Sequence, residues 1–103
     1  MINKINKYDW IILFGGAGRE TCIERILSAG VKVSAIFIPQ SRSVKLEDAL
    51  NVLKKFNCKL IEVTKENMHA ALRSYEGRSL LSIGFPYLVS RISLSLFHPA
   101  INM

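Results

Sequence analysis

The sequence is poor in the residues that cross-link or ligate in small folds. Its 103 residues contain two cysteines, two histidines, three prolines and one tryptophan. Cys22 and Cys58 are far apart in the chain and have no histidine near them. The chain therefore offers neither a disulfide framework nor a zinc-type ligand set, and we expect no metal site. We interpret both cysteines as reduced thiols of a cytoplasmic protein.

Long hydrophobic runs are also missing. The stretch Ile11–Phe14 is too short for the apolar core of a signal peptide. The segment 80–97 approaches the length of a membrane span, but it contains Gly84, Pro86 and Arg91. We therefore expect no contact with a membrane.

Acidic residues are scarce, because 8 Asp and Glu oppose 14 Lys and Arg, for a formal charge of +6. No run of like charges occurs, so we expect a solvated basic surface. Nucleic-acid binding is disfavoured because no basic helix or aromatic platform is visible. Half of the residues are hydrophobic, which is high for a small domain and predicts an exposed apolar edge able to support self-association.

The hydrophobic pattern predicts alternating strands and helices after a loose leader at residues 1–8. Continuous apolar runs indicate strands buried on both faces, and helical spacing indicates amphipathic helices. In the first helix, Cys22, Ile23, Ile26 and Leu27 share one apolar face, and Gly30 ends it. We predict strands at 9–14, 31–38, 59–63 and 79–83, with Pro39 ending the second, and helices at 19–29, 46–57 and 65–75, the last capped by Thr64.

This order predicts an α/β fold over residues 9–103 with an open, mostly parallel, doubly wound, Rossmann-like sheet and helices on both faces. In such sheets ligands bind beyond the carboxyl ends of the strands. The segments that follow the predicted strands are therefore the candidate functional segments.

The last quarter of the chain carries the most specific pattern. A short strand ending at Ile83 breaks at Gly84-Phe85-Pro86, and a connection then leads to Ile101-Asn102. This tract resembles the formyl-tetrahydrofolate-dependent formyltransferases, which include methionyl-tRNA formyltransferases and amino-sugar N-formyltransferases. The resemblance implies transfer of a formyl group from formyl-tetrahydrofolate to a primary amine.

Asn102 matches the catalytic asparagine of that family. The resemblance implies that its amide donates to the formyl oxygen and stabilises the tetrahedral oxyanion; the alternative is an ordinary asparagine at the end of a strand. The family's catalytic histidine and aspartate would lie beyond residue 103. The resemblance thus covers the first half of the family's catalytic domain, and it implies that these 103 residues form a truncated domain that is inactive alone.

The turn after the fourth strand is the implied cofactor site. In the family this segment binds the folate pterin through its backbone, and it is also open to interpretation as a packed turn. The corresponding residues are Gly84, Phe85, Pro86, Tyr87 and Leu88.

The glycines Gly16 and Gly18, which open the first helix, are the implied substrate site. Glycines let the backbone approach an anion, and a helix N-terminus favours negative charge. The resemblance implies that Gly16, Gly18 and Arg19 contact the amine substrate. Alternatives are a simple tight turn and a dinucleotide site, although Thr21 stands where a fingerprint glycine would be expected.

Arg42 follows the second strand and is a further substrate candidate. In methionyl-tRNA formyltransferases this loop grips tRNA, whereas a small anionic amine needs fewer cations, and a solvated loop is the plain alternative. His98 precedes Asn102 at the wrong spacing for catalysis and is predicted in a surface turn; His69 is predicted as an exposed helix residue. A different class of function, a small α/β module that binds a phosphate ligand or a partner without catalysis, remains open.

Overall fold

The structure is a computed structural model that describes residues 9–15, 19–42, 47, 51, 54–56, 58–85 and 91–102. The leader expected at residues 1–8 lies outside this part of the chain. The elements, in chain order, are β1 (Trp10–Phe14), α2 (Glu20–Ser28), β2 (Val33–Pro39), the 3-10 turn η1 (Gln40–Arg42), β3 (Lys59–Val63), α4 (Met68–Arg73), β4 (Ser79–Ile83), α5 (Arg91–Leu94) and β5 (Ala100–Asn102).

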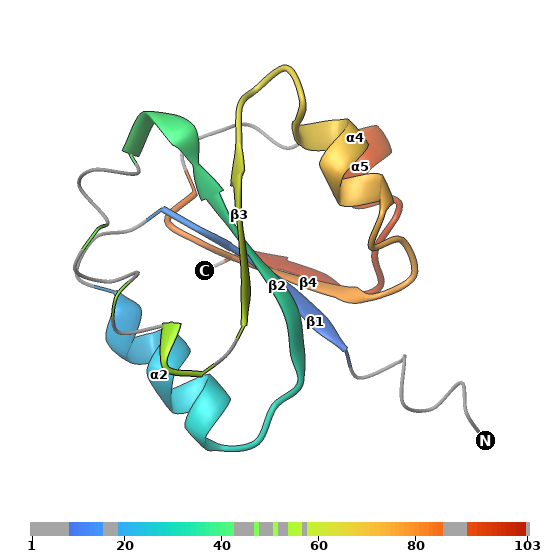
Figure 1. Ribbon diagram of the computed structural model, residues 1–103. Coiled ribbons are helices and arrows are strands. Elements are labelled where there is room, and N and C mark those ends of the chain that lie inside the picture. Colours follow the sequence, from blue (N-terminus) through green and yellow to red (C-terminus); the bar gives the residue numbers. More distant parts are fainter. Residues whose placement is uncertain are drawn as a thin grey trace.

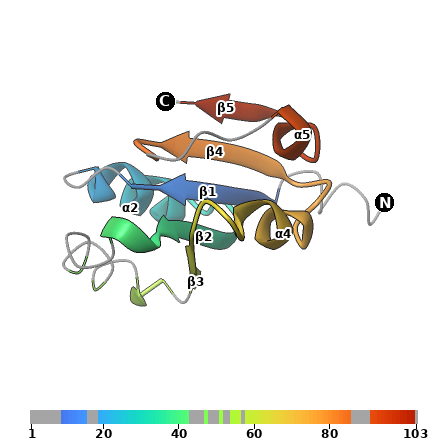
Figure 2. The same ribbon diagram turned by 90° about the horizontal axis from the view of Figure 1, so that it is seen from above.

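All five strands belong to one parallel sheet in the order β3-β2-β1-β4-β5. Figure 2 shows this order with the sheet seen from above. The chain first moves outward from β1 to β3, then returns past β1 and moves outward the other way through β4 to β5. This is the doubly wound arrangement, so the predicted fold class is confirmed.

Alternation along β1 divides the core into two layers. Ile11 and Leu13 belong to the cluster that includes residues of α4, whereas Ile12 and Phe14 belong to the cluster that includes Ile23 of α2. All five side chains have no exposed surface. Burial of a large aliphatic or aromatic side chain stabilises a fold by about 1.5–3 kcal/mol. The sheet is therefore covered by α2 on one face and by α4 and α5 on the other (Figure 1).

Local signals set the ends of these elements. Gly30 follows α2 with a φ of 88°, and Gly84 follows β4 with a φ of 63°, a region that glycine enters without steric cost. Before α4, Thr64 and Asn67 exchange hydrogen bonds. The Asn67 N–H donates to Thr64 Oγ1 over 3.2 Å, and the Thr64 N–H donates to Asn67 Oδ1 over 2.8 Å. This reciprocal pair has the capping-box pattern and closes the turn that leads into α4, but the N-cap of the helix is Asn67 and not the predicted Thr64.

Three details differ from the sequence predictions. Pro39 is the last residue of β2, paired with Val63, rather than the residue after it; the pairing of β2 with β1 ends at Phe37, so β1 requires no N–H from Pro39. Cys22 is exposed, because burial on α2 centres on Ile23 and successive helical residues are turned by about 100°. The helix expected at 65–75 is limited to Met68–Arg73, with turns before and after it.

The helix expected at 46–57 falls largely outside the described residues. Within that range Glu47, Asn51 and Lys54 are helical. The structure also contains three short elements that we did not predict, η1, α5 and β5, and α5 lies in the connection from β4 to β5 at the sheet edge.

Candidate functional site

The carboxyl ends of β1 and β4 meet at the centre of the sheet, where the strand order changes direction. The Gly15 N–H, just after β1, donates to the carbonyl oxygen of Ile83, the last residue of β4, over 3.1 Å. In open parallel sheets this switch point is where ligands bind. The two segments that leave it, after Gly15 and after Ile83, are those singled out in the sequence for substrate and cofactor.

The segment after β4 begins with a sharp change of backbone direction. Gly84 has a φ of 63° and is half-buried, and Phe85 is half-buried against the cluster on the α4 face. In this turn, Phe85 packs against the hydrophobic core and Gly84 adopts the left-handed backbone conformation. The remaining implied cofactor residues, Pro86, Tyr87 and Leu88, lie outside the described residues.

The segment after β1 leads directly into α2. Gly15 is buried, and Arg19 is exposed at the position before the helix, where its carbonyl accepts a hydrogen bond from the Cys22 N–H over 3.0 Å. Gly16 and Gly18 lie outside the described residues. Arg19 therefore lies at the carboxyl edge with its charge in solvent, as a contact to an anionic ligand requires.

Asn102 reaches the same edge through β5. Its backbone pairs with Ser82 of β4, two positions before Gly84. Parallel pairing of β4 and β5 thus brings the end of β5 beside the implied folate turn. The side chain of Asn102 lies outside the described part of the chain.

Arg42 ends η1, which follows β2 on the outer side of β1. Its position after β2 places its backbone on the carboxyl side of the sheet, and its side chain lies outside the described part. The sheet order separates Arg42 from Asn102, because β2 and β5 lie on opposite sides of the β1–β4 pair.

One polar pair between helices was missed by sequence reasoning. His69 was predicted to be exposed, but it is half-buried, and its Nδ1 lies 2.6 Å from Oγ of Ser93. The contact joins the beginning of α4 to α5. Ser93 is 1% exposed, so this pair links two helices and does not present an accessible nucleophile. No spacing rule connects residues 69 and 93, because the contact depends on how the two helices pack.

His98 lies at the opposite, amino edge, before β5. It is exposed, as predicted, and its carbonyl accepts a hydrogen bond from Ser79 Oγ over 3.2 Å. The strand β5 therefore separates its imidazole from the end that carries Asn102.

A second missed group also lies at the amino edge. Asp9 is buried, with Lys32 Nζ 3.7 Å from Oδ1 and Arg78 Nε 4.0 Å from Oδ2. Asp9, Lys32 and Arg78 directly precede β1, β2 and β4, respectively. Their shared position before neighbouring strands was the sequence signal from which this cluster could have been predicted. The cluster lies away from the ligand edge, and we interpret it as structural.

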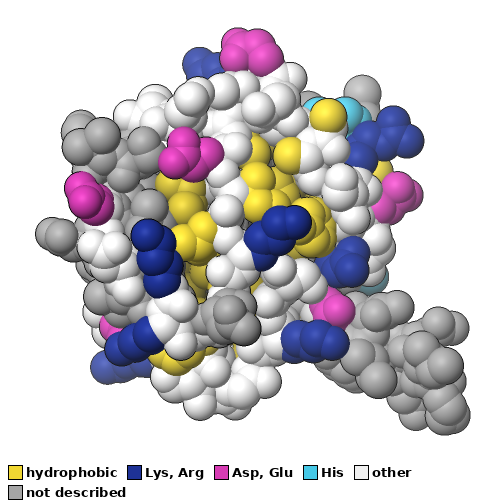
Figure 3. Space-filling view, in the orientation of Figure 1, with side chains coloured by type: hydrophobic (Ala, Val, Ile, Leu, Met, Phe, Trp, Pro, Cys, Tyr) yellow, Lys and Arg dark blue, Asp and Glu magenta, His cyan; other side chains and the backbone are white. Residues whose placement is uncertain are grey.

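The surface charge is mixed. On the face shown in Figure 3, Lys and Arg side chains are scattered among Asp and Glu around a central group of hydrophobic side chains. Among the residues that the structure describes, no three His, Cys, Asp or Glu gather as metal ligands. Within the same residues, none of the helices has both the length and the apolar character needed to traverse a bilayer.

The two cysteines are free thiols in different surroundings. Cys22 is exposed on α2, and Cys58 is half-buried before β3, where its Sγ lies 3.9 Å from the carbonyl oxygen of Val33. Burial raises the pKa of the Cys58 thiol, since the thiolate loses hydration there. A raised pKa makes Cys58 the less reactive thiol.

Comparison with known proteins gives no match: no protein-family model, no curated protein and no solved structure is significantly similar to this chain. The functional argument therefore rests on the residues and their geometry.

Proposed function

We propose that the carboxyl edge between β1 and β4 binds formyl-tetrahydrofolate together with a primary amine, in the manner of the formyltransferases that the sequence resembles. The observation that carries the proposal is the convergence of three segments on one edge. The switch point joins Gly15 to the end of β4, Gly84 redirects the chain there, and β5 delivers the Asn102 backbone beside Ser82.

Each segment has a distinct role in this proposal. The backbone of the turn that begins at Gly84 binds the pterin ring, and the glycine turn with Arg19 binds an anionic amine substrate such as a nucleotide-linked amino sugar. The Asn102 amide donates a hydrogen bond to the formyl oxygen. Removal of one such donor from an oxyanion site typically lowers the rate about 100–1,000-fold.

Residues 1–103 contain no counterpart of the family's histidine and aspartate. Proton transfer by a positioned base typically contributes about 100–10,000-fold to a rate. We therefore assign binding of the formyl donor, and not proton transfer, to these residues.

Calorimetric titration of the full 103-residue chain with 5-formyl-tetrahydrofolate, a stable isomer of the donor, tests this proposal. We expect saturable one-to-one binding. Asn102→Ala should weaken it by about 1 kcal/mol, or about fivefold in Kd, the usual net value of one hydrogen bond. The matched control is Asn51→Ala, at an exposed helical position between β2 and β3. Absence of saturable binding, or equal losses in both variants, would contradict the proposal.

A phosphate-binding module without catalysis is the second candidate, favoured by the exposed Arg19 immediately before α2. Titration with a nucleoside monophosphate separates the two candidates: binding of the nucleotide without binding of the folate supports the module. A tRNA substrate would instead give an affinity that falls steeply with salt concentration.

A further inference from the structure

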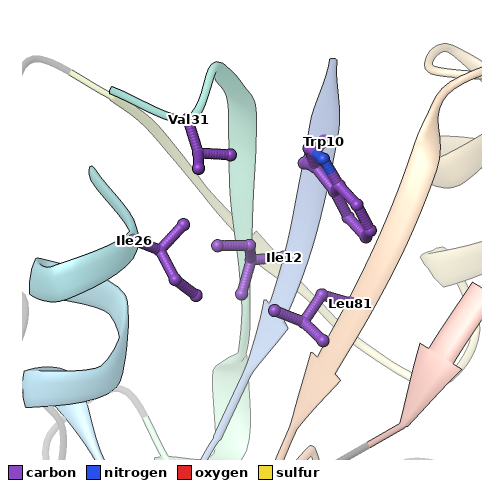
Figure 4. A pocket seen from close by; sticks show the side chains of 5 residues that line it. All are labelled: Trp10, Ile12, Ile26, Val31 and Leu81. Atoms are coloured by element: carbon purple, nitrogen blue, oxygen red, sulfur yellow. The ribbon is translucent and has the colours of Figure 1, made fainter. Parts of the chain in front are cut away.

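We draw no further inference here: the strongest candidate, the apolar pocket on the α2 face that is lined by Trp10, Ile12, Ile26, Val31 and Leu81 (Figure 4), opens to solvent, and nothing in the structure shows what covers it.

Discussion

The backbone N–H of Gly15 donates a hydrogen bond to the carbonyl oxygen of Ile83 over 3.1 Å, which ties together the ends of β1 and β4. This contact extends the pairing of the two central strands by one residue beyond their last register pair, Phe14 and Ile83. It fixes the relative position of the two segments that leave the switch point. The proposed folate-binding turn and the proposed substrate-binding turn therefore begin at two strand ends that are hydrogen-bonded to each other.

Gly84 should be essential for both stability and ligand binding, whereas Gly77 should matter for stability alone. Gly84 has a φ of 63° and Gly77, in the turn before β4, has a φ of 91°. Alanine in this region costs about 1–2 kcal/mol. We expect Gly84→Ala and Gly77→Ala to lower the free energy of unfolding in urea by similar amounts. Folate binding should be lost only in Gly84→Ala; equal binding by both variants would remove the turn from the site.

The turn before α4 provides a test of local stability. Thr64 and Asn67 satisfy each other's backbone N–H groups, and loss of a capping side chain typically costs about 1 kcal/mol. Thr64→Ala should lower the free energy of unfolding by this amount. Thr64→Ser keeps the hydroxyl and should cost much less. Equal losses in the two variants would mean that the methyl group of Thr64, not its oxygen, stabilises this turn.

In the Asp9 cluster, loss of the Asp9 carboxylate should lower the free energy of unfolding more than loss of the Lys32 ammonium group. Asp9 is buried and Arg78 Nε is buried without a hydrogen bond, whereas Lys32 is largely exposed. Asp9→Ala leaves the Arg78 charge without compensation and should cost about 1–3 kcal/mol. Lys32→Ala should cost less than about 0.5 kcal/mol, because solvent screens exposed pairs. Chemical denaturation of the two variants decides this, and a larger loss in Lys32→Ala would refute the assignment.

The two thiols should react at different rates. Cys22 is exposed, and burial raises the pKa of the Cys58 thiol. A raised pKa leaves a smaller fraction of the Cys58 thiol as the reactive thiolate. With a chromogenic disulfide reagent at mildly alkaline pH, we expect a fast phase from Cys22 and a slow phase from Cys58. Cys22→Ser should remove the fast phase, and its persistence in that variant would show that Cys58 is accessible.

The central strands could be predicted because burial on both faces leaves continuous apolar runs. Ile11 to Phe14 and Ala35 to Ile38 are fully or almost fully buried, and short apolar runs bounded by turn residues are typical of strands buried on both faces. The strand β5 gave no such signal, since it has three residues and its central Ile101 is exposed. Its position depends on pairing with β4, which is a tertiary contact.

That the candidate segments follow the carboxyl ends of strands was predictable, but the contacts between elements distant in sequence were not. The rule that ligands bind at strand carboxyl ends selected the segments at Gly84 and Arg19, because it needs only the strand order. The His69–Ser93 contact and the pocket beside Trp10 arise from packing between elements distant in sequence. Helical periodicity indicated that His69 would be exposed, since it cannot detect a second helix placed over the first.

The most direct test of the proposed site is a titration of the ¹⁵N-labelled chain with 5-formyl-tetrahydrofolate, followed amide by amide in two-dimensional NMR spectra. We predict saturable shifts at Gly15, Gly84 and Phe85, on the carboxyl edge, with Gly30 and Gly77 unchanged. Shifts confined to Gly30, Gly77 and other residues of the amino edge, or no saturable shifts at all, would contradict the account.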